Sequence, residues 1–145
     1  MLRYILRGYL LFAPTLLLGL PAQAEITTDG TMGPHATLRG ADMRIGAELG
    51  TTRGANLFHS FDEFNINRGE RVDFASPAGI DTIFSRVTGR NSSRIRGTLG
   101  VLGNADLFLL NPNGIVFGPG SRVDVGALVA STRDISAEQF MDGEL

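Results

Sequence analysis

Residues 107–118 read Leu-Phe-Leu-Leu-Asn-Pro-Asn-Gly-Ile-Val-Phe-Gly, two apolar runs joined by a four-residue turn. The side chain of Asn111 can accept a hydrogen bond from its own downstream backbone, and Pro112 presets φ for the second turn position. Asn113 tolerates the third position, and Gly114 can adopt positive φ as the chain leaves the turn. The flanking runs are rich in Phe, Ile, Val and Leu, which favours strands over helix. A sharp turn between two buried strands predicts an all-β protein.

Short apolar or alternating runs of the same kind fill the chain after residue 24. Turns containing glycine, proline or asparagine separate them, and only two of the 19 glycines lie before residue 25. The predicted strands lie at 37–45, 57–66, 71–75, 80–87, 94–102, 105–110, 115–117 and 122–131. Many short strands at near-regular spacing are typical of a sandwich, a barrel or a solenoid, and the spacing does not distinguish among these.

The run at 57–66 carries Phe58, Phe61 and Phe64, whose spacing of three is also compatible with an amphipathic helix. We reject the helix because β-branched and turn residues flank the run and no helical repeat continues past Ile66. The run is therefore predicted to be a strand. The predicted core draws large apolar side chains from several strands: Phe58, Phe61, Leu107, Leu109, Val116 and Val125.

Two segments look like parallel copies about one coil apart, namely residues 93–97, Ser-Arg-Ile-Arg-Gly, and residues 121–126, Ser-Arg-Val-Asp-Val-Gly. In a solenoid, each coil buries its inward side chains against the next coil. Residues 134–145 are acidic and lack a strand pattern, so they are predicted to form a short helix or a frayed coil. An exposed last coil would present unpaired edge groups, which invites association.

The first 24 residues have the pattern of a secretory signal peptide. A positive region holds two arginines, an apolar region covers residues 9–20, and Ala22-Gln23-Ala24 is a small-residue cleavage site. Cleavage is therefore predicted between Ala24 and Glu25. A transmembrane anchor is disfavoured because the uninterrupted apolar run is only about a dozen residues long, whereas a span needs ~20.

Composition excludes several kinds of chemistry. The chain of 145 residues contains no cysteine, which excludes disulfides, a thiol nucleophile and a cysteine-type zinc site. The net charge is −2, and removal of a leader with two arginines makes it −4, so nothing supports nucleic-acid binding. The 121 residues after the leader suffice for one domain with a modest core.

The titratable residues form no catalytic pattern. His35 and His59 are the only histidines, and His59 precedes Ser60. Adjacent strand residues point to opposite faces, so this pair is badly placed for general-base catalysis, and the same holds for Asp62 and Glu63. The other acids of the strand region lie singly, at Asp73, Asp81, Asp106 and Asp124. We therefore predict no enzymatic activity, no catalytic or metal-binding residue and no cofactor.

Four ordered segments resemble the N-terminal secretion domain, also called the haemagglutination-activity domain, of filamentous-haemagglutinin-type exoproteins. These are the secreted partners of two-partner secretion systems, and the resemblance is strongest to cyanobacterial members. The segments are residues 26–31, 56–66, 83–89 and 105–118, the last followed by 126–132. The resemblance implies a right-handed parallel β-helix with N-terminal capping strands over residues 25–133, after the signal peptide 1–24. Residues 134–145 would begin a truncated continuation or a disordered tail.

The resemblance also implies a function. The chain would be the secretion-targeting module of an adhesin-type exoprotein that is exported to the periplasm by the general secretory machinery. An outer-membrane β-barrel transporter with periplasmic peptide-binding domains would recognise it there. Folding would follow outside a Gram-negative-type cell, leaving the protein secreted or on the cell surface. No nucleic acid or small-molecule substrate is implied. The alternatives are a stand-alone surface or carbohydrate-binding β-solenoid and a non-functional gene fragment.

Two motifs of the family match residues of this chain. The secretion motif corresponds to Asn111, Pro112, Asn113, Gly114 and Ile115, and a second motif to Asn56, Leu57, Phe58, His59, Ser60, Phe61 and Phe64. The residues leave two roles open for the asparagines of the turn, because asparagine is what such a turn requires for its own stability. They can serve secretion indirectly through the shape of the turn, or they can contact the transporter.

Overall fold

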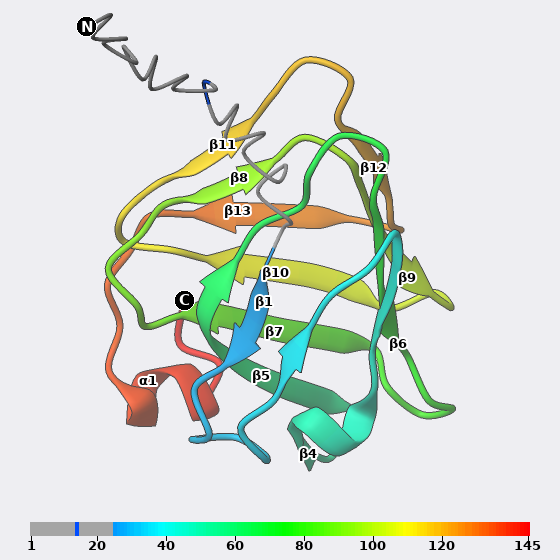
Figure 1. Ribbon diagram of the computed structural model, residues 1–145. Helices are drawn as coiled ribbons and strands as arrows, with labels where there is room; N and C mark the ends of the chain where they lie inside the picture. The colour runs from blue at the N-terminus through cyan, green and yellow to red at the C-terminus, as the bar shows by residue number, and fades with distance from the viewer. Residues whose placement is uncertain (1–13, 15–24) are drawn as a thin grey trace, which may run out of the picture.

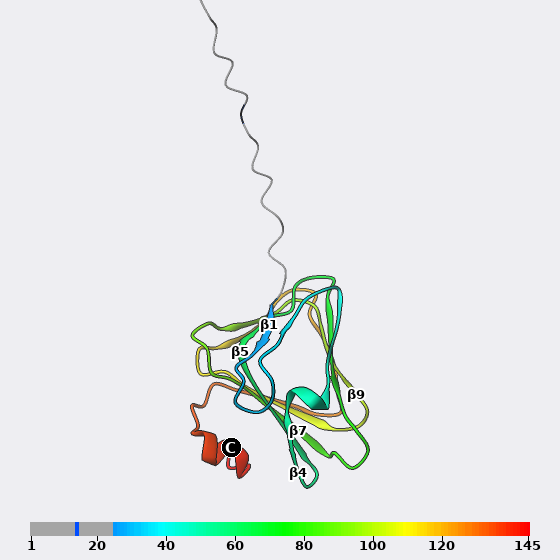
Figure 2. The same ribbon diagram turned by 60° about the horizontal axis from the view of Figure 1, so that its bottom comes forward.

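The computed structural model describes residue 14 and residues 25–145. Within this part of the chain, thirteen strands, a short 3₁₀ helix and one α-helix follow one another. The strands form three sheets, which we call sheets A, B and C. Figure 2 shows that the chain winds around a roughly triangular outline, with the α-helix outside it.

Each sheet collects one strand from successive coils. Sheet A contains β5 (Asn56–Phe64), β7 (Thr82–Val87), β10 (Asp106–Leu110) and β13 (Leu128–Ser131), all parallel. Sheet B contains β3 (Asp42–Ile45), β6 (Arg71–Ala75), β9 (Thr98–Leu102) and β12 (Arg122–Asp124), also parallel. Sheet C contains β8 (Ser93–Ile95) and β11 (Ile115–Phe117), and a parallel bridge from Ile66 to Ile95 extends it.

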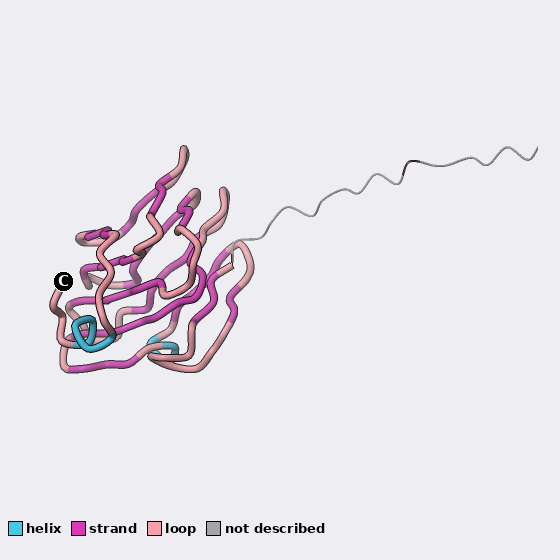
Figure 3. The backbone as a smooth tube through the Cα atoms, turned by 90° about the vertical axis from the view of Figure 1, so that its left-hand side faces the viewer, coloured by secondary structure: helices cyan, strands magenta, loops and turns pink. Residues whose placement is uncertain are grey.

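From β5 onward the chain visits the sheets in the order A, C, B and then returns to A one level along, which makes a parallel β-solenoid of about four turns. The register of sheet A displays the repeat, since Phe58 pairs with Phe84, Phe84 with Phe108, and Phe108 with Val129. The stacked coils are visible from the side in Figure 3. The predicted all-β parallel β-helix is confirmed, and the sandwich and the barrel are excluded.

Antiparallel strands cover the N-terminal end of the solenoid (Figure 1). β1 (Ile26–Thr28) pairs with one end of β5 and with β2 (Thr37–Leu38), while β4 (Thr51–Arg53) pairs with the other end of β5. The 3₁₀ helix η1 (Ala47–Leu49) leads into β4. These strands supply hydrogen-bond partners to an edge that would otherwise be open. The predicted N-terminal capping strands are therefore confirmed.

A bulge explains how phenylalanines three residues apart fit one strand. Phe61 and Phe64 both lie in the central core, although strict alternation would place them on opposite faces of β5. The pairing of β5 with β1 shifts register and skips Asp62. The additional residue returns Phe64 to the inner face, whereas Phe58 lies in a separate cluster outside sheet A. The strand prediction for this run is confirmed, and the amphipathic helix is excluded.

The predicted core is largely correct. Phe58, Phe61, Leu107 and Leu109 are fully buried, and Val125 is partly exposed but packs against the core. Val116 was predicted wrongly, because 55% of it is exposed. It pairs with the exposed Arg94, so its register position in sheet C faces outward, while the neighbouring Ile115 packs against the core.

The predicted stacking of residues 93–97 on residues 121–126 is also wrong. β8 pairs with β11, and β12 pairs with β9, so the two segments belong to different sheets. Alternation of arginine with an apolar residue reflects an outward and an inward face, which every side of a solenoid has. Similar alternation therefore does not identify strands that stack.

The residues after β13 run along the outside of sheet A and end in α1 (Ala137–Met141), the short-helix alternative for the tail (Figures 1 and 3). A capping box begins this helix: Gln139 N donates to Ser136 Oγ, and Ser136 N donates to Gln139 Oε1. Phe140 is fully buried, with its ring centroid 5.3 Å from that of Phe58 and 6.4 Å from that of Phe84. The tail therefore covers the stacked rings of Phe58 and Phe84, which lie on neighbouring coils.

No helix within the described residues is long and apolar enough to cross a membrane. Except for Pro14, the predicted signal peptide lies outside the described residues, and so does Ala24 of the predicted cleavage site. Glu25, on the other side of that site, is described and forms an ion pair of 3.3 Å with Arg39.

Candidate functional site

The turn of residues 111–114 forms the corner between sheets A and C in its coil. Asn113 N donates to Asn111 Oδ1 at 3.0 Å, and Gly114 N donates to the Asn111 carbonyl at 3.0 Å. Gly114 has a φ of +111°, a conformation that glycine adopts without strain. The side-chain bond of Asn111 to its own downstream backbone and the positive φ of Gly114 are both as predicted.

Asn111 also connects this corner to its neighbours. It is fully buried, and its Nδ2 donates to the Asn91 carbonyl and to Ser93 Oγ, each at 3.0 Å, on the preceding coil. Its backbone N donates to the Ser131 carbonyl, on the following coil, at 2.9 Å. Asn111 therefore satisfies polar groups on three successive coils, in a place where an unpaired group would be costly.

Asn113 is exposed, yet it bonds to the same preceding corner, because its Nδ2 donates to the Gly89 carbonyl at 2.7 Å. Gly89 in turn lies tight against the carbonyl of Asp62, one coil further down, and a Cβ at Gly89 would collide with that oxygen. The corners of three coils therefore stack in close contact, and the asparagine turn is the outermost of them.

The sequence did not single out the partners of Asn111. The available signal was a second turn rich in asparagine, glycine and serine at residues 89–92, which can be aligned with residues 111–114 as the preceding corner. Asn91 itself donates to Glu63, on the coil before it. A column of amide and carboxylate side chains thus lines this corner of the solenoid.

A second polar network ties the capping strands to the outside of sheet A. Asp29 Oδ2 accepts hydrogen bonds from Ser60 Oγ and Thr88 Oγ1, both at 2.6 Å, and Oδ1 accepts from Thr31 Oγ1 at 2.7 Å. Burial by itself would raise the pKa of Asp29, but these bonds to the ionised carboxylate outweigh it and lower the pKa. The carboxylate is therefore charged in the folded protein at neutral pH.

Arg86 completes this network. Its Nε donates to Ser60 Oγ at 2.9 Å, and its guanidinium carbon lies 4.9 Å from the centroid of the Phe140 ring. Burial lowers the pKa of Arg86, and the charge of Asp29 opposes that shift. Ser60 is thus held in place between a cation and an anion.

His59 points away from this network into the core. It is fully buried, its ring lies 5.4 Å from Phe74 between centroids, and neither ring nitrogen has a hydrogen-bond partner. Burial lowers the pKa of His59 to about 4, although the Leu49 backbone and the charge of Glu48 favour the protonated form. His59 and Ser60 enter different environments, as their adjacency in a strand predicts.

The remaining residues of the second predicted motif serve packing. Leu57, Phe61 and Phe64 lie in the central core, Phe58 lies in the outer aromatic cluster, and Asn56 begins β5. The acids stay dispersed. Asp62 lies 3.7 Å from His35. Arg71 forms ion pairs with Asp73 at 2.7 Å and with Asp124 at 3.0 Å. Gly100 leaves room for these groups, because a Cβ at this position would collide with Asp73 Oδ1. Within the described residues, no three acids or histidines are placed to hold a metal ion.

A pocket of about 280 Å³ lies beside the asparagine turn. Its lining comes from the end of β7 and the residues after it, from the turn itself, and from the tail that leads to α1. The residues are Arg86, Val87, Thr88, Gly89, Leu110, Pro112, Asn113, Arg133, Asp134 and Ile135. The predicted secretion motif thus contributes Pro112 and Asn113 to a surface feature, while Asn111 stays inside.

Comparison with known proteins gives a consistent match. Residues 24–145 match the family described as TPS secretion domain, a range that includes α1. A heme/hemopexin-binding protein of Haemophilus influenzae strain Rd is 37% identical over 78 residues, which are 54% of this chain and 8% of that protein. A second Haemophilus influenzae protein of the same description is 35% identical over 72 residues, 50% of this chain and again 8% of the relative. The matched segment is therefore under a tenth of the length of these relatives.

Proposed function

The chain belongs to the family of TPS secretion domains, the modules that target two-partner-secretion exoproteins for export, and we propose how its residues serve that task. The general secretory machinery delivers the chain to the periplasm, and the leader is removed between Ala24 and Glu25. Peptide-binding domains of an outer-membrane β-barrel transporter capture the extended chain, with β-augmentation as the mode of binding. Folding outside the cell then proceeds coil by coil, and the apolar area buried in each coil opposes return.

The secretion motif, residues 111–115, acts in this scheme through folding. The observation that supports this is the burial of Asn111 and its bonds to the coils on both sides. A side chain so enclosed is inaccessible to a partner of the folded domain, but it joins a newly formed coil to the one before it. Asn113 and Pro112 are exposed and remain the members of the motif that can touch a partner.

The test is to compare secretion with stability across the turn. Asn111→Ala, Asn113→Ala and Gly114→Val are co-expressed with the cognate transporter, and the secreted fraction is measured beside the denaturant midpoint of each purified variant. Asn104→Ala is the matched control, because Asn104 is an exposed turn asparagine between β9 and β10. We expect the secreted fraction to fall in the order of lost stability, with the control unchanged.

Two results would contradict this role. If Asn111→Ala abolishes secretion while the denaturant midpoint stays the same, Asn111 contacts the transporter in the unfolded chain. If every turn variant is secreted like the parent, the motif has no part in the mechanism. N-terminal sequencing of the exported protein tests the cleavage site separately, since retention of Met1 in exported material would exclude a cleaved leader.

We further propose that the exoprotein targeted by this module is an adhesin of the cell surface. The assignment would be supported if cells that express the transporter adhere to a surface and cells with a deleted transporter gene do not. The names of the two relatives describe proteins of which the matched segment is 8%, so heme and hemopexin binding are not carried over to this chain.

A further inference from the structure

Arg86 is a buried cation without a carboxylate partner. Only 9% of the residue is exposed, yet within the described residues no acid lies within ion-pair distance of its guanidinium. Asp29 is connected to the guanidinium through Ser60, whose hydroxyl donates to Asp29 and accepts from Arg86. Buried charges in proteins are normally paired directly, because an unpaired one forfeits its hydration.

The guanidinium also has unused donors. Nε bonds to Ser60 at 2.9 Å, and Nη2 approaches Thr31 Oγ1 at 3.5 Å, the limit of a hydrogen bond. Nη1 has no hydrogen-bond partner in the described part of the chain, and this nitrogen is not fully buried. Arg86 is among the residues that line the pocket beside the asparagine turn.

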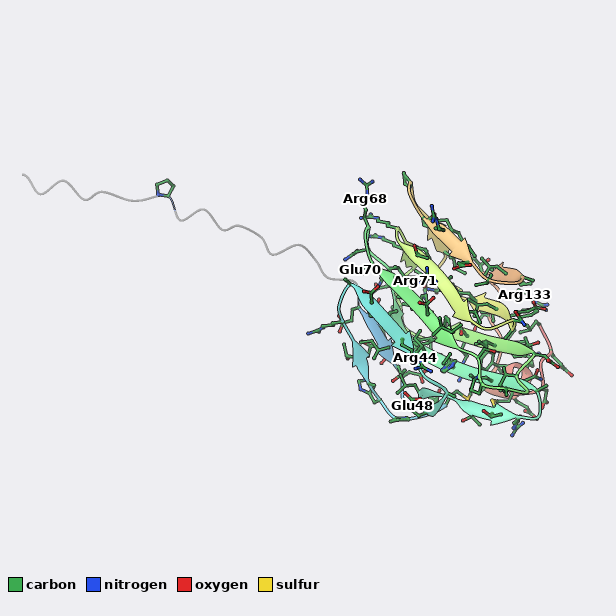
Figure 4. The ribbon with its side chains drawn as sticks, turned by 90° about the vertical axis from the view of Figure 1, so that its right-hand side faces the viewer. Arg44, Glu48, Arg68, Glu70, Arg71 and Arg133 are labelled. Carbon is green, nitrogen blue, oxygen red and sulfur yellow. The ribbon has the colours of Figure 1, made fainter. Side chains whose placement is uncertain are left out.

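The rest of the pocket suits a small amphiphilic group. Leu110 and Ile135 provide apolar lining, and Arg133 from the tail is a second arginine of the lining. Figure 4 shows Arg133 well apart from Arg44 and Arg71 of sheet B and from Arg68 in the turn before β6. A volume of about 280 Å³ is just below the usual range of ligand sites and is enough for a side chain and its neighbouring backbone.

We propose that this pocket binds the carboxylate of an acidic residue in an extended peptide. Two arginines line one small cavity, and arginine donates paired hydrogen bonds to a planar anion such as a carboxylate. Asp134, which is also in the lining, and Asp29, which is bonded to Ser60, limit the positive potential, and this favours a singly charged carboxylate over a phosphate dianion. The apolar lining accommodates the aliphatic part of the ligand.

This site goes beyond secretion, because it exists only after the coils and the tail have folded together. Its walls come from β7, from the asparagine turn one coil later and from the segment before α1. An unfolded chain in the periplasm has no such pocket. The ligand is therefore a partner of the exported, folded domain.

The experiment is an NMR titration of the purified, 15N-labelled protein with acetyl-Leu-Glu-amide, in the absence of any transporter. We expect saturable shifts at the backbone amides of Gly89 and Asn113, and about tenfold weaker binding of the uncharged acetyl-Leu-Gln-amide. Arg133→Gln should weaken binding of the glutamate peptide several-fold, whereas Arg122→Gln, an exposed arginine of sheet B, should leave it unchanged. Arg86→Lys keeps the charge and removes the planar fork, so it should also weaken binding.

The proposal is overturned if neither peptide gives saturable shifts or if both bind equally. It is also overturned if Arg133→Gln and Arg86→Lys leave the affinity unchanged, or if Arg122→Gln weakens binding as much as Arg133→Gln. Inorganic phosphate that binds more tightly than the glutamate peptide would exclude selectivity for a carboxylate. Because no step of the titration involves the transporter, a negative result would not contradict the proposed role in secretion. A positive result would not support that role either.

Discussion

Apolar strand residues are buried to different extents at the two ends of the solenoid. At the N-terminal end, β1, β2 and β4 cover β5, and Ile26 of the cap is itself fully buried. At the other end, β12 pairs with β9 alone among the described strands, and its Val123 stays open to solvent. Burial in a solenoid therefore depends on the coil alongside as much as on the direction of a side chain.

One ladder of sheet B isolates this effect. Val72, Leu99 and Val123 occupy the same register position on β6, β9 and β12. The first two are 0% exposed and the third is 41% exposed. The three residues are similar in chemistry, so the difference comes from the pairing of their strands: β6 and β9 each lie between two strands, whereas β12 pairs with β9 alone among the described strands. Substitutions along this ladder and at the two ends can break or sharpen the comparison.

The largest effect is expected inside the ladder. Leu99→Ala removes a fully buried side chain between two coils, and the cavity should lower the free energy of unfolding by about 2–5 kcal/mol. Chemical denaturation followed by circular dichroism measures it. A midpoint equal to that of the parent would mean that the inner face of sheet B is not packed as described.

The capped end should be sensitive to acid through His59. Its folded pKa of about 4 lies below the ordinary value of 6.5, so the unfolded chain binds the proton more readily. The stability from neutral His59 is complete above pH 6.5 and decreases as the pH falls towards 4, by roughly 3 kcal/mol in total. Denaturation at successive pH values measures this loss.

Two variants control for other groups that titrate. His59→Leu should remove the loss between pH 6.5 and 4, whereas His35→Ala should keep it, because the His35 side chain is 62% exposed. Asp29 contributes in a lower window, since its depressed pKa gives stability that is lost only as the pH falls below about 3.8. An unchanged slope in His59→Leu would show that the cap does not shield this ring.

The asparagine turn should respond by a smaller amount, and unequally at its two asparagines. Asn111→Ala leaves Ser93 and two backbone groups short of partners in a buried corner, at a cost of about 1–3 kcal/mol. Asn113→Ala loses exposed hydrogen bonds and should cost about 0.5–1.5 kcal/mol. Thermal unfolding of both variants measures the order, and the reverse order would contradict the buried position of Asn111.

The smallest effect is expected at the open end. Val123→Ala trims a side chain that is already 41% exposed, so the free energy of unfolding should change by no more than about 0.5 kcal/mol. A loss similar to that of Leu99→Ala would show that something covers this coil in solution. Sedimentation of the parent protein at rising concentration would then distinguish association between copies from a monomer.

The sequence by itself determined the strands of the coils, the turn chemistry and most of the core, but its residue patterns did not locate the capping strands Ile26–Thr28 and Thr51–Arg53. Alternation marks inward and outward residues locally, and Asn111 and Gly114 have the conformations that their residue types predict. The polarity of the tail and the capping pattern at Ser136 are local signals as well. Each of these features depends on residues a few positions apart, which a single sequence displays directly.

Only the tertiary structure decided which segments are neighbours. Residues 93–97 looked like a copy of residues 121–126 because both alternate polar with apolar side chains, although β8 stacks on β11. The bulge at Asp62, the exposure of Val116 and the partners of Asn111 depend on contacts between coils. Such contacts join residues 18 or more positions apart, and each one is set by the length of the turns between them. Periodicity within a strand carries no information about those lengths, and this is why the pocket beside Arg86 could not be read from the chain.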